Sequence, residues 1–260
     1  MQLFCFGFGY TAGYFAKALH WEQVSGTHRG DLPLNSASRA KLAAATHILL
    51  SIPPDADGDL ILRENYSMNP KWVGYLGTTG VYGDHQGGWV DETTPAAPPN
   101  ARSEWRVIAE KQWLASGLPV HIFRLSGIYG PGRSAIDELK NGTARRIAKE
   151  NQYFSRIHVE DIAQILSLSV ANPTPGEIFN CADDLPAPAA EVVEYAAKLM
   201  GIEPPPLVPF EKAALSEMAK SFYMNSRRMK NDKIKQMLGV KLKYPTYREG
   251  LSAIWHASGL

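Results

Sequence analysis

The sequence has 260 residues, which suits one large domain or one domain with a small annex. Apolar residues make up 45% and charged residues 20%, which excludes a disordered, collagenous or coiled-coil chain. Lys and Arg total 27 against 26 for Asp and Glu, so a net charge of +1 provides no bulk basic field for nucleic acid.

Cellular location is predicted from three further features. No apolar run approaches the ~20 residues of a membrane span, and the N-terminus lacks the cationic region of a signal peptide. Cys5 and Cys181 both lie in apolar surroundings, which indicates buried thiols of a reducing compartment. We therefore expect a cytoplasmic protein with neither a membrane nor a nucleic-acid partner.

Short apolar runs alternate with helical patterns through the first half. Strands are expected over about 3–6, 23–27, 47–52, 72–76 and 120–125, and a helix over 11–19. Between the second and third strands only a strand stub (32–34) and one helix (36–44) fit, so either the sheet is reduced or residues are absent from the sequence. The alternation predicts an α/β fold, a Rossmann-like doubly wound parallel sheet with helices on both faces.

The second half is richer in proline, with helices expected over 189–200 and 211–220. We expect residues 1–182 to form the Rossmann core, with 129–151 contributing to a substrate crevice. Residues 183–260 are expected to form a small, mostly helical C-terminal lobe. Such a lobe would pack against the carboxyl ends of the strands, where an open α/β sheet places its ligand crevice.

The glycine-rich segment Gly7-Phe8-Gly9-Tyr10-Thr11-Ala12 follows the first strand and begins a helix. In a dinucleotide-binding loop the first glycine permits the tight turn and the second lets the backbone approach a pyrophosphate, while Ala12 keeps helix and strand close. Backbone N–H groups at the helix N-terminus then face the phosphates. An ordinary strand-to-helix turn is the alternative.

Cofactor choice depends on the end of the second strand, Thr27-His28-Arg29. An NAD site places an Asp or Glu on the ribose there, whereas the planar guanidinium of Arg29 suits a 2′-phosphate. The sequence thus favours NADP over NAD. The alternative is that Arg29 is a solvated loop residue and Asp31 binds the ribose.

Six motifs in order resemble the short-chain dehydrogenase/reductase superfamily, in its extended or atypical, NAD-dependent epimerase/dehydratase-like branch. The resemblance covers nearly the whole chain. In chain order the motifs are Gly7-x-Gly9-x-x-Ala12, Leu50-Ser51-Ile52-Pro53-Pro54, Thr78-Thr79-Gly80-Val81-Tyr82-Gly83-Asp84, Asp91-Glu92-Thr93-Thr94-Pro95, Phe123-Arg124-Leu125-Ser126-Gly127-Ile128-Tyr129-Gly130-Pro131-Gly132-Arg133 and Ile157-His158-Val159-Glu160-Asp161-Ile162-Ala163.

The resemblance assigns roles position by position. Thr78 matches the catalytic Ser or Thr. The segment that lies under the cofactor's ribose matches Ser51, Ile52 and Pro53, and the stretch beside the nicotinamide matches Leu125, Ser126 and Gly127.

The family's Tyr-x-x-x-Lys pair is replaced. With Glu110 fixing the register, Arg102 occupies the tyrosine position and Arg106 the lysine position. Guanidinium stays protonated, so Arg102 cannot relay a proton, although Arg106 can still hold the ribose. Spaced i and i+4, both arginines would share one helix face. We interpret them as a cationic clamp for substrate; the alternative is a surface Arg–Glu ladder that continues to Glu110.

Other candidates carry weaker signals. Tyr82 and Tyr129 are candidate proton donors at strand ends, or else packing residues. In related epimerases the region of Arg133 and Arg156 contacts a nucleotide-sugar diphosphate, so these arginines are candidate substrate ligands, or else part of a solvated basic face. His158 is expected to be structural and Asp161 a helix cap. No metal-ligand spacing is present, so no metal is expected.

These features predict an NAD(P)-binding oxidoreductase or epimerase-like enzyme of atypical mechanism that acts on a small anionic or nucleotide-linked substrate. The alternative is a non-catalytic, NAD(P)H-binding redox sensor, favoured by the loss of both relay positions. The expected assembly is a monomer or homodimer.

Overall fold

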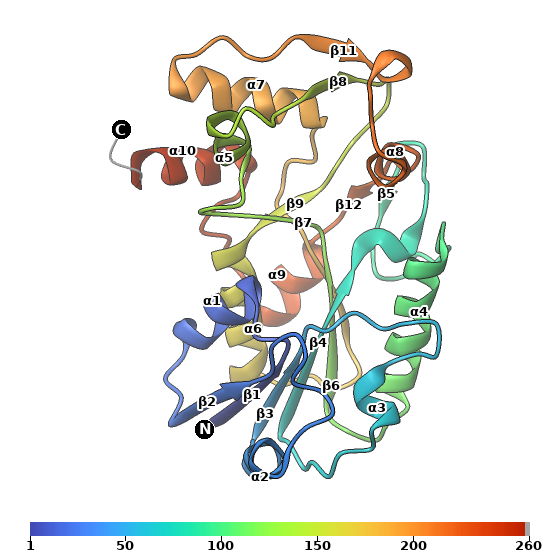
Figure 1. The fold of residues 1–260 in the computed structure, drawn as a ribbon, viewed down its shortest axis with the longest axis vertical. Coiled ribbons are helices and arrows are strands. Elements are labelled where there is room, and N and C mark those ends of the chain that lie inside the picture. The colour runs from blue at the N-terminus through green and yellow to red at the C-terminus, as the bar shows by residue number, and fades with distance from the viewer. Residues whose placement is uncertain (258–260) are drawn as a thin grey trace.

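The computed structural model describes residues 1–257 and arranges six parallel strands in one central sheet (Figure 1). The order across the sheet is β2-β1-β3-β4-β6-β10. The strands are β1 (Gln2–Phe6), β2 (Gln23–Gly26), β3 (His47–Leu50), β4 (Trp72–Thr78), β6 (Val120–Leu125) and β10 (Ile178–Cys181). The five expected strands are confirmed, and β10 is an edge strand that the apolar runs did not reveal.

The direction of winding reverses between β1 and β3. β2 pairs with one side of β1, and β3 pairs with the other side. At such a switch point the loops after two neighbouring strands separate and leave a crevice. Between β2 and β3 the chain forms one helix, α2 (Ser36–Ala44). The strand stub expected over 32–34 is wrong, because these residues form no strand. Within the described residues the sheet ends at β2, so the reduced sheet is confirmed.

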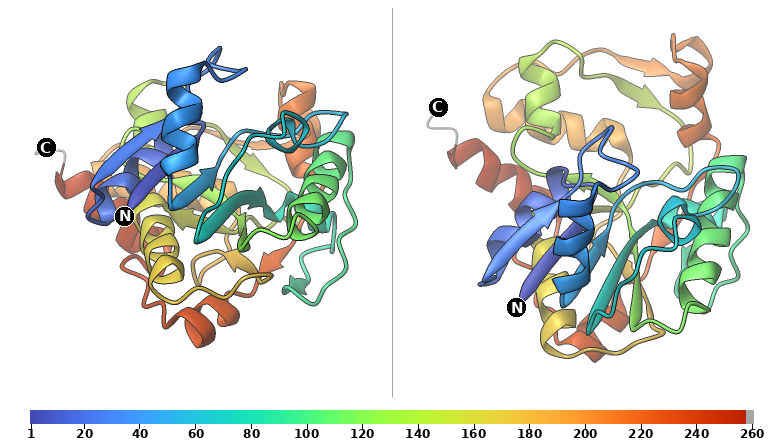
Figure 2. Two further views of the ribbon diagram at one scale, coloured as in Figure 1. Left: turned by 90° about the horizontal axis from the view of Figure 1, so that it is seen from below. Right: turned by 60° about the horizontal axis from the view of Figure 1, so that its bottom comes forward.

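Helices cover both faces of the sheet, as the view from below shows (Figure 2). One face carries α1 (Tyr10–Ala18), α6 (Val159–Ala171) and α9 (Asp232–Leu238), and the other α2, α3 (Leu60–Arg63) and α4 (Ala101–Leu114). Side chains of a strand alternate between faces. Accordingly Leu3 and Cys5 of β1 belong to one core cluster, and Phe4 and Phe6 to the other.

A second layer lies beyond the carboxyl ends of the strands (Figure 1). It contains α5 (Ala135–Lys140), α7 (Ala189–Met200), α10 (Tyr247–Ala257) and the parallel pair β8 (Arg146–Ala148) and β11 (Leu207–Pro209). Its helices share an apolar cluster that includes Ile136, Val192 and Leu251. The helix expected over 211–220 is wrong: the chain forms a 3₁₀ turn, η2 (Phe210–Lys212), and then α8 (Glu217–Tyr223).

Short strand pairs connect the two layers. β7 (Gly127–Tyr129) pairs with β9 (Arg156–His158), and β5 (Trp89–Val90) pairs with β12 (Arg228–Met229). Ile234 and Leu238 of α9 return to the core of the sheet. Residues after 182 therefore belong to both layers, and the expected boundary at 182 does not separate them.

Both cysteines are buried and free, as expected. None of the helices in the described part is long and apolar enough to cross a membrane.

Candidate functional site

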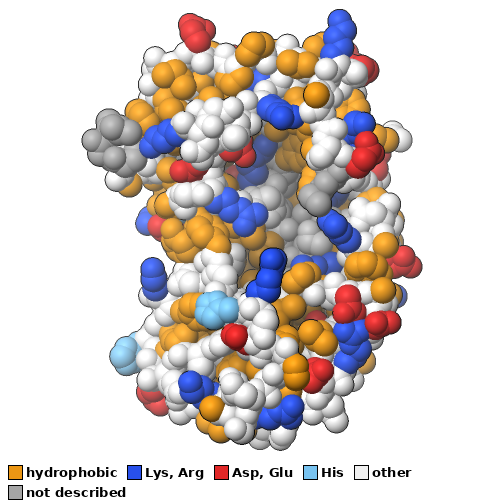
Figure 3. Space-filling model, in the orientation of Figure 1, with side chains coloured by type: hydrophobic (Ala, Val, Ile, Leu, Met, Phe, Trp, Pro, Cys, Tyr) orange, Lys and Arg blue, Asp and Glu red, His pale blue; other side chains and the backbone are white. Residues whose placement is uncertain are grey.

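A cavity of about 1100 Å³ lies between the sheet and the second layer. Its walls come from the loops after β1, β3, β4 and β6, from the first two turns of α4, and from residues 153–156 and 221–229. Figure 3 shows a hollow across the middle of the molecule, with several Lys or Arg side chains on its walls. A cavity at the switch point of a doubly wound sheet is the expected place for a ligand.

The glycine loop at one end of this cavity is held by two hydroxyl side chains. Gly7 has φ +85°, and a Cβ there would stand 2.8 Å from Ser51 Oγ, so only glycine suits this turn. Its N–H donates to Thr27 Oγ1 (3.0 Å), and Ser51 Oγ donates to its carbonyl oxygen (2.6 Å). Thr27 and Ser51 therefore position the loop, and Ser51 also lines the cavity.

Gly9 is the N-cap of α1 and lines the cavity. A Cβ at Gly9 would meet nothing within 4 Å, so the space beside this backbone is open. No side chain caps α1, whereas Asn35 and Asn100 cap α2 and α4. The first-turn N–H groups of α1 are thus left for an acceptor from the cavity, which fits the pyrophosphate of a dinucleotide.

Thr78 ends β4 and lines the same cavity. Its Oγ1 accepts a hydrogen bond from the N–H of Gly80 (3.0 Å), at the start of the 3₁₀ helix η1 (Thr79–Tyr82). The hydroxyl hydrogen of Thr78 remains available to donate. A Cβ at Gly80 would lie 3.3 Å from Thr78 Oγ1 and 3.5 Å from Ser103 Oγ, so these two hydroxyls flank Gly80.

Arg102 and Arg106 line the cavity together with Thr78. Arg106 Nη1 donates to the carbonyl oxygen of Leu76 (2.9 Å), at the end of β4. Arg102 is exposed and forms no hydrogen bond or ion pair with any described residue. The surface-ladder alternative is wrong, because Glu110 is only 2% exposed and points into the core.

Arginines dominate the charge of the cavity. Arg133, Arg156 and Arg227 line it in addition to Arg102 and Arg106, whereas no Asp or Glu of residues 1–257 does. Arg133 and Arg156 line the cavity, whereas Arg146, which lies between them in the sequence, does not and pairs with Glu194 (2.6 Å). Such a cavity attracts an anion.

Both candidate proton-donor tyrosines are packing residues, a correction to the expected substrate site. Tyr82 is fully buried, and its hydroxyl donates to Asn180 Oδ1 (2.8 Å). Tyr129 packs in the second layer, and its hydroxyl donates to the carbonyl oxygen of Thr246 (3.4 Å). Neither residue lines the cavity.

His158 has the capping role that was expected of Asp161, and Asp161 has a structural role instead. His158 caps α6, with Nδ1 accepting from the N–H of Glu160 (3.2 Å). Burial lowers the pKa of His158 to about 4, so the ring is neutral. Asp161 is not the cap; its carboxylate accepts the N–H groups of Lys243 (2.6 Å) and Tyr244 (3.1 Å), which anchors the approach to α10.

Some expected cofactor residues lie outside the cavity wall. His28 and Arg29 are exposed after β2, and the N–H of His28 donates to Asp31 Oδ2 (2.7 Å). Phe8 and Ile52 pack beside the core clusters, Ala12 is buried among them, and Pro53 is exposed. Tyr10 lines the cavity, and its hydroxyl donates to the carbonyl oxygen of Pro131 (3.0 Å).

Several residues that line the cavity belong to none of the sequence motifs and were not predicted. Leu125, Ser126 and Gly127 line the wall as the resemblance implies, but Ser103, Tyr153, Asn225 and Arg227 were not expected. The last three reach the cavity only because the loop that follows α8 lies against residues 151–155. No local pattern signals such a pairing.

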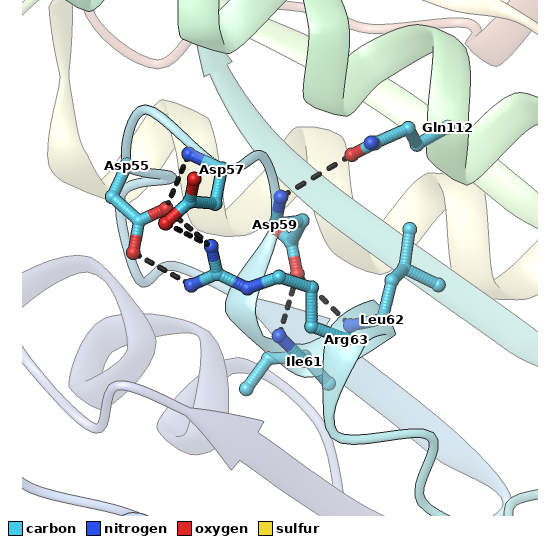
Figure 4. Close-up of polar contacts among 7 residues, drawn as sticks. All are labelled: Asp55, Asp57, Asp59, Ile61, Leu62, Arg63 and Gln112. Atoms are coloured by element: carbon cyan, nitrogen blue, oxygen red, sulfur yellow. Dashed lines mark hydrogen bonds and ion pairs between the residues drawn. The ribbon is translucent and has the colours of Figure 1, made fainter.

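One arginine, Arg63, binds two of the three aspartates in the loop after β3 (Figure 4). Arg63 donates to both oxygens of Asp55 (2.7 and 2.6 Å) and lies 3.4 Å from Asp57 Oδ2. Asp59 caps α3 through the N–H groups of Ile61 and Leu62. In the described part of the chain no His, Cys, Asp and Glu side chains gather as a metal site would require.

Comparison with known proteins identifies relatives of the whole chain. No protein-family profile matches the sequence. A solved structure from Silicibacter pomeroyi DSS, described as a functionally unknown conserved protein, is 46% identical, with a TM-score of 0.87 over 100% of this chain and 99% of that one. This chain belongs to the same family as that protein.

Curated relatives match over part of their length. Protein YeeZ of Escherichia coli (strain K12) is 37% identical over 138 residues, 50% of this chain and 47% of YeeZ. The 3-diazoavenalumate denitrifying reductase of a Streptomyces species is 29% identical over 181 residues, 62% of this chain and 58% of that protein. This chain thus spans about half the length of the curated relatives that it matches.

More distant solved structures share the fold. RMD from Pseudomonas aeruginosa, complexed with NADPH, is 17% identical with a TM-score of 0.73 over 98% of this chain and 99% of that one. DesIV, a dTDP-glucose 4,6-dehydratase from Streptomyces venezuelae solved with NAD and TYD bound, is 15% identical with a TM-score of 0.79 over 99% and 97%. This chain therefore shares its fold with proteins described as NAD-dependent epimerases or dehydratases.

Proposed function

We propose that this protein is an NAD(P)-dependent oxidoreductase or epimerase-like enzyme of atypical mechanism that acts on a small anionic or nucleotide-linked substrate. The supporting observation is one cavity that joins the glycine loop, Thr78 and a wall of arginines, with no carboxylate from the described residues. Its volume of about 1100 Å³ exceeds the range of roughly 300–1,000 Å³ for a site of one small ligand. A dinucleotide and a substrate can therefore share it.

The chain's own residues suit the dinucleotide. Gly9 and the uncapped first turn of α1 would bind the pyrophosphate, and the segment from Leu125 to Gly127 would lie beside the nicotinamide. When bound, the nicotinamide supplies or accepts the hydride. RMD and DesIV were solved with NADPH and NAD respectively, so the fold accommodates both cofactors.

NADP is the proposed cofactor on two grounds at the end of β2. Arg29 is exposed there and pairs with no described residue, so its guanidinium is available to a 2′-phosphate. Asp31 already accepts the N–H of His28, which makes it a poorer ribose ligand. NAD is the alternative.

At the reacting end, Thr78 and Arg102 are the proposed substrate ligands. The Thr78 hydroxyl has its oxygen engaged by Gly80 and its hydrogen available, so it is suited to donate to a substrate oxygen. Arg102 supplies a fixed positive charge and cannot exchange a proton. An anionic group beside Arg102 fits this pair, and water must carry any proton that a tyrosine would otherwise relay.

A redox sensor is the second candidate function. Arginine at both relay positions favours it, because dinucleotide binding needs no proton transfer. The likeness to the Streptomyces reductase favours the enzyme. The buried, free thiols support the further proposal that the protein works in the cytoplasm.

Calorimetry with NADPH and NADH, followed by a screen of anionic carbonyl compounds for change in nicotinamide absorbance, tests the proposal. We expect one dinucleotide to bind and at least one carbonyl compound to oxidise its reduced form. Because an epimerase returns its cofactor to the starting redox state, NMR of each compound is recorded as well and reports conversion without an absorbance change. Binding of a dinucleotide with neither an absorbance change nor conversion supports the sensor, and binding of neither dinucleotide overturns both functions.

A further inference from the structure

We propose that Ser103 is a catalytic residue of this cavity, a second hydroxyl donor that acts together with Thr78 on the reacting oxygen of the substrate. The inference rests on the proposed function, because it needs a substrate with a carbonyl or alcohol oxygen. The binding of such an oxygen can nevertheless be tested without turnover.

Ser103 lies in the first turn of α4, one residue after Arg102. It lines the cavity and is only 9% exposed. The Ser103 N–H donates to Oδ1 of the N-cap residue Asn100 (3.0 Å), but the Ser103 hydroxyl forms no hydrogen bond with any described residue. A largely buried hydroxyl without a partner is costly, so we expect it to bind an acceptor from the cavity.

The absence of a side chain at Gly80 brings the hydroxyls of Ser103 and Thr78 to one place. A Cβ at Gly80 would lie 3.3 Å from Thr78 Oγ1 and 3.5 Å from Ser103 Oγ, so both oxygens border the space that this glycine leaves open. Thr78 Oγ1 accepts the N–H of Gly80, which leaves its hydrogen available. All three residues line the cavity. A substrate oxygen in front of Gly80 can therefore accept both hydroxyl hydrogens.

A hydrogen bond between α4 and β4 fixes this pair of hydroxyls. Arg106, one turn after Ser103, donates through Nη1 to the carbonyl oxygen of Leu76 (2.9 Å), two residues before Thr78. The helix that carries Ser103 is thus attached to the strand that carries Thr78. Donors held in place in this way stabilise a developing negative charge without having to reorient during the reaction.

Two donors at one oxygen suit the reduction of a carbonyl group. As the carbonyl carbon accepts a hydride and the cofactor is oxidised, the π electrons of the C=O bond move to the oxygen. The Thr78 and Ser103 hydroxyls donate to that oxygen, and the neighbouring Arg102 supplies a positive charge. A proton from water then forms the new O–H bond, and the hydroxide returns to solvent. Ser103 thus stabilises charge, and water supplies the proton.

Other serine hydroxyls in the cavity wall are less suitable. Ser126 Oγ also has no partner, but protein atoms enclose it, so a substrate oxygen cannot reach it. The Ser51 hydroxyl is already used, since it donates to the carbonyl oxygen of Gly7 (2.6 Å). The Ser103 hydroxyl, in contrast, is unpartnered and lies beside Thr78.

Calorimetric titration of oxamate at saturating NADPH tests the pair, because its carboxylate suits Arg102 and its amide carbonyl stands for the reacting group. Ser103→Ala should weaken oxamate binding about fivefold, the scale of one neutral hydrogen bond. It should lower kcat for a carbonyl compound that wild type converts by about a hundredfold. Its stability in urea should not fall, because the hydroxyl has no partner in the free protein; a merely structural role would lower stability instead.

Two further variants make the test specific. Gly80→Ala keeps both hydroxyls but places a methyl group beside them, so it should weaken oxamate binding to a similar extent. Ser38→Ala is the matched control, since Ser38 has the same position in α2, with its N–H donated to the N-cap residue Asn35 (2.8 Å), and does not line the cavity. This control should change neither oxamate affinity nor kcat.

The proposed function and this inference can fail separately. If wild type converts a compound and Ser103→Ala has the same kcat, the inference alone is overturned. If neither NADPH nor NADH binds, or no compound is converted, the proposed function fails, and titration of oxamate into the free protein decides the inference. Weaker binding in both Ser103→Ala and Gly80→Ala then supports the donor pair; equal binding in wild type and Ser103→Ala, or none in wild type, overturns it.

Discussion

Glu110 of α4 and Arg124 of β6 form an ion pair inside the core, with 2.8 Å between Arg124 Nη2 and Glu110 Oε2. Their side chains are 3% and 7% exposed. The Arg124 guanidinium also lies 4.9 Å from the ring centroid of Tyr82, whose hydroxyl reaches Asn180 of β10. These contacts tie α4, which carries Arg102 and Arg106, to two strands of the sheet.

Replacement of Glu110 by Gln should therefore lower the free energy of unfolding by about 3–5 kcal/mol, because it leaves the buried Arg124 without a counter-ion. Urea denaturation measures the change. Glu104→Gln, on the exposed side of the same helix, is the control and should change stability by less than about 0.5 kcal/mol. A loss of similar size in both variants would show that the buried pair has no special importance.

Local patterns were sufficient for most of the fold. The apolar runs predicted five strands because a parallel sheet buried on both faces needs continuous apolar segments, and α2 and α7 begin and end where expected. The helix over 211–220 was wrong because helical spacing alone did not reveal the turn at η2. The course of the chain after 182 depends on tertiary pairing of β12 with β5, which no local pattern encodes.

In the site, too, residues that follow local motifs were predicted, and residues placed by tertiary contacts were not. Residues fixed by a strand end, such as Gly9, Thr78 and Ser126, line the cavity where the motifs place them. Tyr82 has the motif position too, yet the 3₁₀ turn of η1 sends its ring into the core. Arg227 reaches the cavity through hydrogen bonds with a segment about 75 residues away in sequence, and so could not be foreseen.

Gly9→Val should abolish the thermal stabilisation that NADPH or NADH gives. The Cβ position at Gly9 is open, so valine fits the free protein but occupies the space that the pyrophosphate needs. Gly13→Ala in the same helix is the matched control; it also meets no atom within 4 Å, should keep the ligand-induced shift, and should raise the stability of the free protein by roughly 0.5–1 kcal/mol. Differential scanning fluorimetry measures both. A normal shift in Gly9→Val contradicts the assigned phosphate site.

Arg29→Ala should weaken NADP(H) by roughly 1.5–3 kcal/mol and leave NAD(H) unchanged, because only the former carries a 2′-phosphate. Calorimetric titration of both cofactors into both proteins measures the difference. Lys17→Ala, another surface cation on the N-terminal half, serves as control. Equal losses for the two cofactors, or none, would show that Arg29 does not discriminate between them.

Stability should fall with rising pH because of Asp183. Burial raises the pKa of its carboxyl to about 8, against about 3.9 in an unfolded chain. Between these values the folded protein holds a proton that the unfolded chain releases, so ionisation progressively opposes folding. Asp183→Asn cannot ionise and should gain stability relative to wild type as pH rises from about 5 to about 8. Urea denaturation at both pH values measures the free energy of unfolding of Asp183→Asn and of wild type, with the exposed Asp57→Asn as control. If the difference in free energy between Asp183→Asn and wild type is the same at both pH values, the prediction is contradicted.

Arg102 and Arg106 should prove unequal members of the clamp. Arg102 is exposed and forms no hydrogen bond or ion pair with a described residue, so Arg102→Ala should leave folding and dinucleotide affinity unchanged but weaken an anionic probe such as oxalate by about tenfold. Arg106 donates to the Leu76 carbonyl oxygen at the end of β4, so Arg106→Ala should also lower stability, by about 1 kcal/mol. Lys111→Ala, on the exposed side of α4, is the control for general loss of charge.

Calorimetry with oxalate in the presence of saturating dinucleotide measures the change in oxalate affinity, and urea denaturation measures the change in stability. If oxalate binds Arg102→Ala and wild type equally, the clamp is wrong; if it responds only to Arg106→Ala, the anion is bound at the lysine position alone. Because arginine keeps its proton throughout the accessible range, the oxalate affinity of wild type should also show no step between about pH 8 and about pH 10.5, where a tyrosine at this position would lose its proton.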